Sequence, residues 1–201
     1  ELFQGGDKEV YNMSTDIFVV DTPFLIEKLE EEAAKEEPRK LRYVLRDLAV
    51  AENAFAYEYT GYLSNIHSVK AYFDANLDML ESQKFYSLFA PNQKVYTKVK
   101  NEEPTYYATS SEVKRSQFAS GSIVRGKVEN SVISCNVDLS EGSSVSHSIL
   151  FPRVNVAKGA TVEYAIVDKG VEIAEGVTIR GTENNPVVIK KGSVVTEDIV
   201  R

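Results

Sequence analysis

Two histidines and one cysteine are the side chains best suited to acid–base, metal or nucleophilic chemistry. His147 could act as the general base of an acyltransferase, deprotonating an acceptor hydroxyl. Its counterparts 17 residues away are Asn130 and Tyr164, which favours an outward polar position instead. A zinc site of the carbonic-anhydrase kind needs three histidines, and the chain has only His67 and His147. Cys135, the single cysteine, excludes a disulfide framework and is expected to be a core or corner residue.

Composition excludes several classes of protein. The 201 residues are 43% hydrophobic, enough for one large or two modest cores. The net charge of -7 argues against a nucleic-acid partner, which would require a basic face. No run of 18 apolar residues occurs, so no membrane partner is expected. The N-terminus lacks a charged-then-apolar leader, and we expect a cytoplasmic protein.

A 17-residue repeat runs through the C-terminal third and supplies the framework for these side chains. Aliphatic residues within each period are about five or six apart, with Gly, Asn, Ser and Asp between them. A triangular prism of parallel strands requires this pattern, because each face needs one inward aliphatic residue and each corner a turn former. The repeated sets are Ile133, Leu150 and Val167; Val137, Val154 and Val171; Leu139, Val156 and Ile173; Gly142, Gly159 and Gly176; and Val128, Val145, Val162 and Ile179.

We therefore predict a left-handed parallel β-helix of the hexapeptide type over residues 120–201. This hand is an exception to the right-handed rule for parallel crossovers, and the hexapeptide pattern is what supports it. The segment 181–186 interrupts the repeat, which indicates a loop before a last, irregular coil. Residues 91–119, with Pro104 and the pair Tyr106–Tyr107, are interpreted as a connector.

Residues 1–90 show the pattern of an incomplete α/β domain. Strands are predicted at 16–20 and within 54–59, and helices from Thr22 to before Pro38, around Leu41 to Leu48, and over 69–82. Thr22 is the expected N-cap of the first helix. No glycine-rich phosphate loop precedes these elements, so a nucleotide cradle is not expected in this polypeptide.

The order of these parts and two stretches of sequence resemble a known family. Tyr62–Ile66 and the following Ala71–Leu80 are similar to the end of the nucleotidyltransferase domain of bacterial ADP-glucose pyrophosphorylases (glucose-1-phosphate adenylyltransferases). In that family an aromatic-Trp-x-Asp-[IV]-Gly-[ST] stretch precedes a helix reading A-Y-[WF]-x-A-N-L-x-L, and a hexapeptide β-helix follows. The resemblance extends from Tyr11 onward and corresponds to the C-terminal half of a family member.

The chain departs from the family's catalytic pattern at the positions that the resemblance assigns to chemistry. Leu63 replaces the tryptophan, and Asn65 replaces the aspartate that binds the metal ion. An amide supplies an oxygen but no charge to neutralise a dication, so Asn65 is a poor magnesium ligand. No catalytic residue and no metal site are therefore predicted for this chain.

The sugar-contacting positions are also changed. Tyr43 and Val44 replace the Asp-Phe pair of the family's D-F-G-K-D-I-I segment. Met13 and Ile17 replace the serine and tyrosine of its A-S-M-G-I-Y segment. No substrate-binding residue is therefore expected.

The family's functional residue is changed at every position that can be assigned. In this respect the chain resembles the GlgD-type second subunit of the glycogen-pathway enzyme. This resemblance implies a regulatory, catalytically degenerate subunit that assembles with a catalytic partner, with self-association left open. It implies no cofactor in this chain, and magnesium only in the catalytic partner. Two alternatives stay open: a truncated enzyme altered by drift, and a hexapeptide-repeat acyl- or nucleotidyltransferase active by itself.

Basic side chains near the C-terminus suggest one further site. Sugar phosphates regulate enzymes of this family, so an anionic effector could bind Arg180, Lys190, Lys191 and Arg201. Adjacent lysines near a chain end are more commonly solvated, and the sequence leaves both interpretations open.

Overall fold

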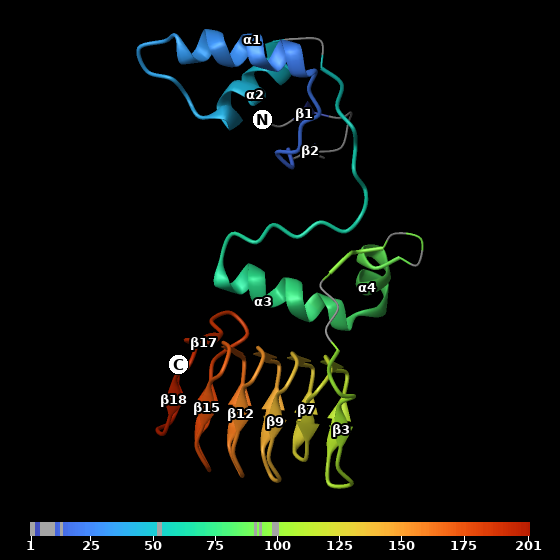
Figure 1. The fold of residues 1–201 in the computed structure, drawn as a ribbon, viewed down its shortest axis with the longest axis vertical. Helices are drawn as coiled ribbons and strands as arrows, with labels where there is room; N and C mark the ends of the chain where they lie inside the picture. Colours follow the sequence, from blue (N-terminus) through green and yellow to red (C-terminus); the bar gives the residue numbers. More distant parts are fainter. Residues whose placement is uncertain are drawn as a thin grey trace. The chain divides into compact units, whose positions relative to one another are not determined.

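The computed structural model describes residues 3–4, 11–12, 14–51, 54–90, 92, 94–97 and 101–201. It divides into two compact units, residues 1–60 and 61–201, which are treated separately below. Figure 1 shows the chain with its elements labelled. Among the described residues, no helix is long and apolar enough to cross a membrane.

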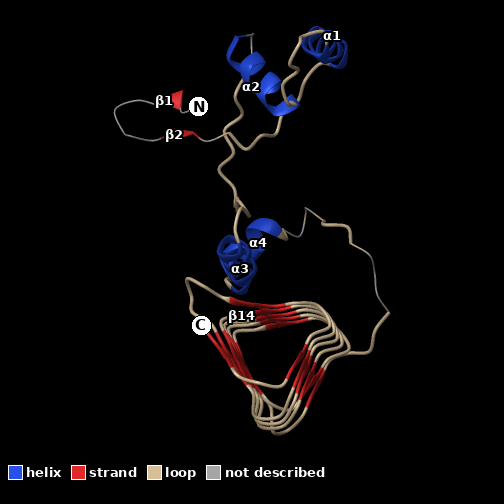
Figure 2. Ribbon diagram, turned by 90° about the vertical axis from the view of Figure 1, so that its left-hand side faces the viewer, coloured by secondary structure: helices blue, strands red, loops and turns tan. Residues whose placement is uncertain are grey.

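The second unit is dominated by a parallel β-helix with three faces, each a sheet running along the prism (Figure 2). Face 1 consists of β3 (Tyr106–Tyr107), β6 (Ile123–Val124), β9 (Asp138–Leu139), β12 (Asn155–Val156), β15 (Glu172–Ile173) and β18 (Val194–Val195). Face 2 consists of β4 (Glu112–Lys114), β7 (Lys127–Glu129), β10 (Ser144–Ser146), β13 (Thr161–Glu163), β16 (Thr178–Arg180) and β19 (Ile199–Val200). Face 3 consists of β5 (Gln117–Phe118), β8 (Val132–Ile133), β11 (Ile149–Leu150), β14 (Ala165–Val167) and β17 (Val187–Ile189).

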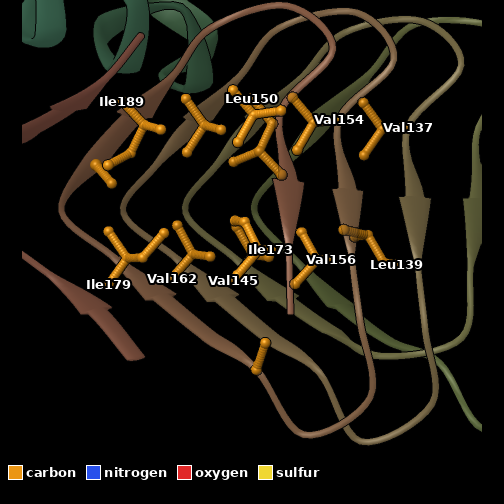
Figure 3. Close-up of a cluster of buried hydrophobic side chains, with 14 of the residues drawn as sticks. Val137, Leu139, Val145, Leu150, Val154, Val156, Val162, Ile173, Ile179 and Ile189 are labelled. Atoms are coloured by element: carbon orange, nitrogen blue, oxygen red, sulfur yellow. The ribbon is translucent and has the colours of Figure 1, made fainter. Parts of the chain in front are cut away.

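The 17-residue repeat sets the register of the central coils. Val145 pairs with Val128 and Val162, and Val156 pairs with Leu139 and Ile173. These side chains point into the prism and stack in rows along its length (Figure 3). Stacking identical aliphatic shapes coil upon coil removes each from water, which is the main favourable term in folding.

Each corner of the prism bends through a left-handed backbone conformation. The corner between faces 1 and 2 uses Gly142, Gly159 and Gly176, all with positive φ, where glycine carries no steric penalty. The other two corners admit polar and aromatic residues at positive φ. They contain Arg115, Asn130, His147 and Tyr164 between faces 2 and 3, and Gly121, Asn136, Arg153, Gly170 and Gly192 between faces 3 and 1.

Buried serine hydroxyls satisfy the backbone at the corner between faces 2 and 3. Ser131 Oγ donates to the Glu129 carbonyl at 2.7 Å and accepts from the Ser148 N–H at 3.1 Å. Ser148 Oγ in turn donates to the Ser146 carbonyl and accepts from the Ala165 N–H. An unpaired polar group there would incur a desolvation cost, so these hydroxyls support the turns.

The β-helix starts at Tyr106, earlier than the expected residue 120, so part of the expected connector belongs to the first coil. Tyr106 pairs with Ile123, but Val113 pairs with Val128 and Phe118 pairs with Ile133 at a spacing of 15. The shorter step takes the first coil out of the 17-residue register, which is why the repeat does not reveal it.

The last coil is longer, as the interrupted repeat indicated. Ala165 pairs with Val187 across a loop that contains residues 181–186, and Glu172 pairs with Val194. Thr182 and Asn185 close this loop with a short antiparallel bridge. The expected loop followed by an irregular coil is therefore present.

Helix α3 (Val69–Leu77) packs on the outer side of face 3 (Figure 2). Phe73 is buried against Ile149 and Ile166, which project outward from neighbouring strands. The predicted single helix over 69–82 instead breaks at a 3-10 turn, η1 (Asp78–Leu80), and continues as α4 (Ser82–Leu88). At this break the Met79 carbonyl accepts a hydrogen bond from Gln117 Nε2 of β5 at 2.5 Å, which is a second contact between the helices and the β-helix.

The first unit contains the paired strands β1 (Phe3–Gln4) and β2 (Tyr11–Asn12), and the helices α1 (Thr22–Ala33) and α2 (Leu41–Ala51). Asp21, rather than the predicted Thr22, caps α1, because its carboxylate accepts the Phe24 N–H at 3.1 Å. Proline follows in the first turn, where its missing N–H is harmless.

A buried carboxylate joins α1 to the start of α2. Glu32 accepts from Arg39 Nε at 2.9 Å and from the Arg39 N–H at 3.0 Å, and Lys35 Nζ pairs with its second oxygen. Asp47 pairs with both Arg39 and Arg46. These hydrogen bonds hold the pKa of Glu32 far below its usual range, with Arg39 as the main cause.

Two predicted strands do not form. Residues 16–20 and 54–59 form no strand in the described part of the chain, and Asp16 has a positive φ of 55°. Ile17 and Val19 are 79% and 101% exposed, and Phe55 and Tyr57 are 92% and 90% exposed. The apolar run at 16–20 and the alternation at 54–59 are typical of strands, but a strand needs a neighbour to satisfy its backbone groups.

Candidate functional site

The positions that correspond to the family's metal-binding stretch lie in an exposed segment before α3. Leu63 is 61% exposed and Asn65 is exposed. The Asn65 carbonyl accepts the His67 N–H at 3.1 Å and lies 3.0 Å from His67 Nδ1, forming a tight turn that leads to the Ser68 cap. This geometry orients the start of α3 and brings no carboxylate to Asn65.

The sugar-contacting positions fall in the first unit. Val44 is buried within the α1–α2 pair, while the adjacent Tyr43 lies on the outer side of α2. Ile17 is exposed in the extended segment before α1. Met13 lies outside the described residues. Neither the buried valine nor the exposed isoleucine offers a hydrogen-bonding group to a sugar.

The residues present do not fit the magnesium ion that the family's chemistry requires. A magnesium site next to phosphates uses carboxylate oxygens to balance charge. Within the described parts of the chain, no group of three or more histidine, cysteine or acidic residues is placed to hold a metal ion. The carboxylate position of the family is occupied by the amide of Asn65, and we derive no metal-assisted step.

The structure does not assemble the four basic residues near the C-terminus into one site. Arg180 Nε pairs with Glu163 Oε2 at 2.7 Å on face 2. Lys190 and Arg201 line a hollow of about 460 Å³ at the end of the prism, whose lining also includes Glu197 and Asp198. Lys191 is exposed and is not part of this lining.

The hollow at the C-terminal end has an apolar floor. Its lining includes Val187, Ile189, Val195 and Ile199, the inward residues of the last described coil, of which the first three are 2%, 6% and 7% exposed. Among the described strands, β17, β18 and β19 are each paired on one side only. A solenoid end of this kind is normally capped or covered.

The last coil also exposes a valine on each outer face. Val194 follows Asp138, Asn155 and Glu172 in register on face 1, and it is 65% exposed. Val200 follows Arg180 on face 2 and is 63% exposed. Val188 follows Ile166 on face 3 and is 47% exposed, although Ile166 itself lies under α3. The outward positions therefore change from polar or covered to apolar and open.

Two aromatic side chains lie next to each other in the first coil, at the opposite end of the prism. Tyr107 and Phe118 occupy the inward positions of the first coil and meet edge to face with ring centroids 5.4 Å apart. Burial raises the pKa of Tyr107. Tyr107 is nevertheless 47% exposed and Val113 is 38% exposed, so apolar side chains are exposed at both ends of the prism.

His147 lies at a corner between faces 2 and 3 and is half-buried, rather than fully outward as its register indicated. Its ring stacks on Tyr164 with centroids 4.8 Å apart, and its Nε2 lies 3.2 Å from Asn130 Nδ2. Its Nδ1 is buried, and no hydrogen-bond partner for it occurs among the described residues. Both ring nitrogens are thus turned into the protein, so the side chain is not presented to an acceptor hydroxyl. Cys135 is buried, as expected of a core residue.

Comparison with known proteins agrees with the repeat and with the whole-chain pattern. The family described as "GlmU-like, C-terminal hexapeptide" matches residues 99–186. The glycogen biosynthesis protein GlgD of Bacillus subtilis is 34% identical over 198 residues, which cover 98% of this chain and 55% of that protein. GlgD of Geobacillus stearothermophilus is 53% identical over 127 residues, covering 63% of this chain and 37% of that protein.

Relatives whose name is that of an enzyme, glucose-1-phosphate adenylyltransferase, match a shorter part of the chain. The glucose-1-phosphate adenylyltransferase of Clostridium acetobutylicum is 31% identical over 123 residues, 60% of this chain and 32% of that enzyme. The match to GlgD of Bacillus subtilis extends through nearly the whole chain. The chain belongs to the GlgD-type family. It spans about half the length of the Bacillus subtilis relative that it matches.

Membership and the hexapeptide match confirm the predicted left-handed β-helix and the resemblance. Two functional features were not foreseen from the sequence. The outward valines of the last coil become visible only when Val188, Val194 and Val200 are aligned with polar residues of earlier coils, and the longer last period hides that alignment. The docking of Phe73 on face 3 has a clearer signal, because Ile149 and Ile166 recur at the 17-residue spacing on the outward side.

Proposed function

We propose that this GlgD-type protein is a regulatory, catalytically degenerate subunit that acts in glycogen biosynthesis with a catalytic glucose-1-phosphate adenylyltransferase. The names of its relatives support the pathway. Its lack of catalysis is supported by Asn65 and Leu63, which replace a charged ligand and an aromatic side chain. Magnesium would then be held by the catalytic partner alone.

The exposed valines of the last described coil are the observation that carries this proposal. Partner binding requires apolar side chains that are costly to leave in water, and the last described coil exposes one on each face: Val188, Val194 and Val200. In the hollow at this end of the prism, Lys190 and Arg201 lie with Glu197 and Asp198, so both signs of charge can guide orientation. The chain would contribute binding surface, and the partner would contribute chemistry.

The test is co-purification and light scattering of this chain with the catalytic subunit. We expect a mixed oligomer, and we expect the Val194→Asp, Val200→Asp double variant to weaken it at least about tenfold, because each charge would be buried unpaired. The matched control is Asn155→Asp, Thr161→Asp on faces 1 and 2 of an inner coil. Unchanged mass and kinetics of the partner in the presence of wild-type chain would refute the proposal.

The alternative, a hexapeptide-repeat transferase active by itself, depends on an accessible base. His147 is the candidate base, and its stacking on Tyr164 and inward Nδ1 argue against that role. An His147→Gln variant would separate the two hypotheses. The regulatory hypothesis requires partner binding to be retained, whereas the transferase hypothesis requires loss of acyl or nucleotidyl transfer.

A further inference from the structure

The outer side of α2 carries an unusual concentration of positive charge. Residues 39–46 contain Arg39, Lys40, Arg42 and Arg46 and no acidic residue, in a chain whose net charge is -7. Arg42 and Arg46 are one helical turn apart, where like charges destabilise a helix by a few tenths of a kcal/mol. A bound anion would offset this repulsion between the two arginine side chains.

The two guanidinium groups converge on one aromatic ring. The Arg42 Cζ lies 4.6 Å and the Arg46 Cζ lies 5.5 Å from the ring centroid of Tyr43. Arg42 Nη2 donates to the Tyr43 hydroxyl at 2.6 Å. All three side chains are exposed, so their remaining donors are accessible to a ligand.

The carboxylates nearby do not neutralise this group. Asp47 accepts from Arg46 and is shared with Arg39. Arg39 is also bound to the buried Glu32. In the described part of the chain, no carboxylate forms an ion pair with Arg42, whose guanidinium has only the phenol as a side-chain partner. The pKa of Arg42 is raised mainly by its hydrogen bond to Tyr43 and, to a smaller extent, by the charge of Asp16, which is not in ion-pair contact with it.

Phosphate chemistry fits these donors better than carboxylate or sugar chemistry. A guanidinium presents parallel N–H groups that match two phosphate oxygens, and two such groups can bind one dianion. The Tyr43 hydroxyl can donate a third hydrogen bond, and its ring can support the attached organic group. We propose that Arg42, Tyr43 and Arg46 form a binding site for the phosphate group of a small phosphorylated metabolite.

The site is separate from the basic residues near the C-terminus and does not depend on the proposed function. Binding can be measured on the whole chain without a partner or any activity. A failure here leaves the partner-binding hypothesis intact, and a failure there leaves this site intact.

The test is calorimetric titration of the full chain with inorganic phosphate, glucose phosphate and AMP in separate experiments. We expect saturable binding that weakens with added salt and that drops at least about tenfold in the Arg42→Gln, Arg46→Gln double variant. The matched control, Arg125→Gln, Lys158→Gln, removes the same charge from the β-helix and should leave affinity unchanged. Tighter binding of glucose phosphate or of AMP than of inorganic phosphate would identify the group that rests on Tyr43.

A second variant, Tyr43→Phe, distinguishes a binding site from general electrostatic attraction. It keeps the charge and the ring but removes the hydroxyl, so affinity should fall several-fold while the salt dependence stays the same. Retained helical circular dichroism in each variant shows that α2 is still folded. Absence of binding to all three probes, or equal binding by the double variant and the charge-matched control, would overturn the proposal.

Discussion

At the residue scale, the inward rows of the prism are specified by side-chain type more strictly than the outer faces. Val145 and Val162 are 1% and 0% exposed and stack directly on each other. The outward neighbours of Val162 include Glu163, which pairs with Arg180 at the 17-residue spacing of the repeat. A charged side chain is therefore tolerated at an outward position but not in place of an inward valine.

Replacing Val162 by Asp should strand a carboxylate among aliphatic residues and cost roughly 4 kcal/mol or more of unfolding free energy. Lys158→Asp is the matched control, because Lys158 is exposed and its change should stay within about 0.5 kcal/mol. Thermal or chemical denaturation of the two variants is the measurement. Equal losses would show that the inward register is misassigned.

At the element scale, sequence reasoning located the helices and the central coils but not the elements that lack a complete context. The helix at 22–33 follows from its aliphatic spacing and proline, and the central coils follow from the 17-residue repeat. The predicted strands have suitable local patterns, an apolar run at 16–20 and an alternation at 54–59, but strand formation depends on a neighbouring strand that the local sequence does not encode. The first coil was missed because its spacing of 15 breaks the dominant period.

The α1–α2 pair should lose stability in acid because it depends on the charged form of Glu32. The folded-state pKa is lowered by Arg39 and Lys35, so this contribution is complete above the unfolded pKa of about 4.3. It declines as the pH falls through and below that value. Helical circular dichroism followed from neutral pH to about pH 3 should therefore decrease in the wild-type chain.

The Glu32→Gln variant should be less helical at neutral pH and should respond less to acid, because the buried network has already lost its negative charge. Glu30→Gln removes the same charge from an exposed position of the same helix and should behave like the wild type. If acid reduced helicity equally in all three proteins, Glu32 would not be the responsible group.

At the scale of the whole molecule, the fold was more predictable than the site. A solenoid repeats one local solution, so a few periods of sequence specify its interior. A contact surface has no such redundancy. Val194 and Val200 are distinguished only by the polar residues Glu172 and Arg180 that precede them in register, and Val188 only by the loss of the helix that covers Ile166. Degenerate positions such as Asn65 were identified by comparison with a family pattern, since the loss of a function leaves no local physical signature.

The chain by itself should not form ADP-glucose from ATP and glucose 1-phosphate. Phosphoryl and nucleotidyl transfer depend on positioning and on neutralising the charge of the phosphates, usually with a carboxylate-bound metal ion. Here Asn65 supplies no charge, and Val44 and Ile17 supply no hydrogen bond to a sugar. Product formation in an assay with magnesium should stay at the level of a no-protein control.

Restoring one residue should not restore the reaction, because the missing contributions are coupled. Asn65→Asp returns a carboxylate, but the sugar contacts at Tyr43 and Val44 remain changed. We therefore expect the Asn65→Asp variant to remain inactive while it keeps the circular dichroism and oligomeric state of the wild type. Product above background from the wild-type chain, in a preparation free of host enzyme, would show that catalysis has not been lost, and the regulatory hypothesis would then have to be abandoned.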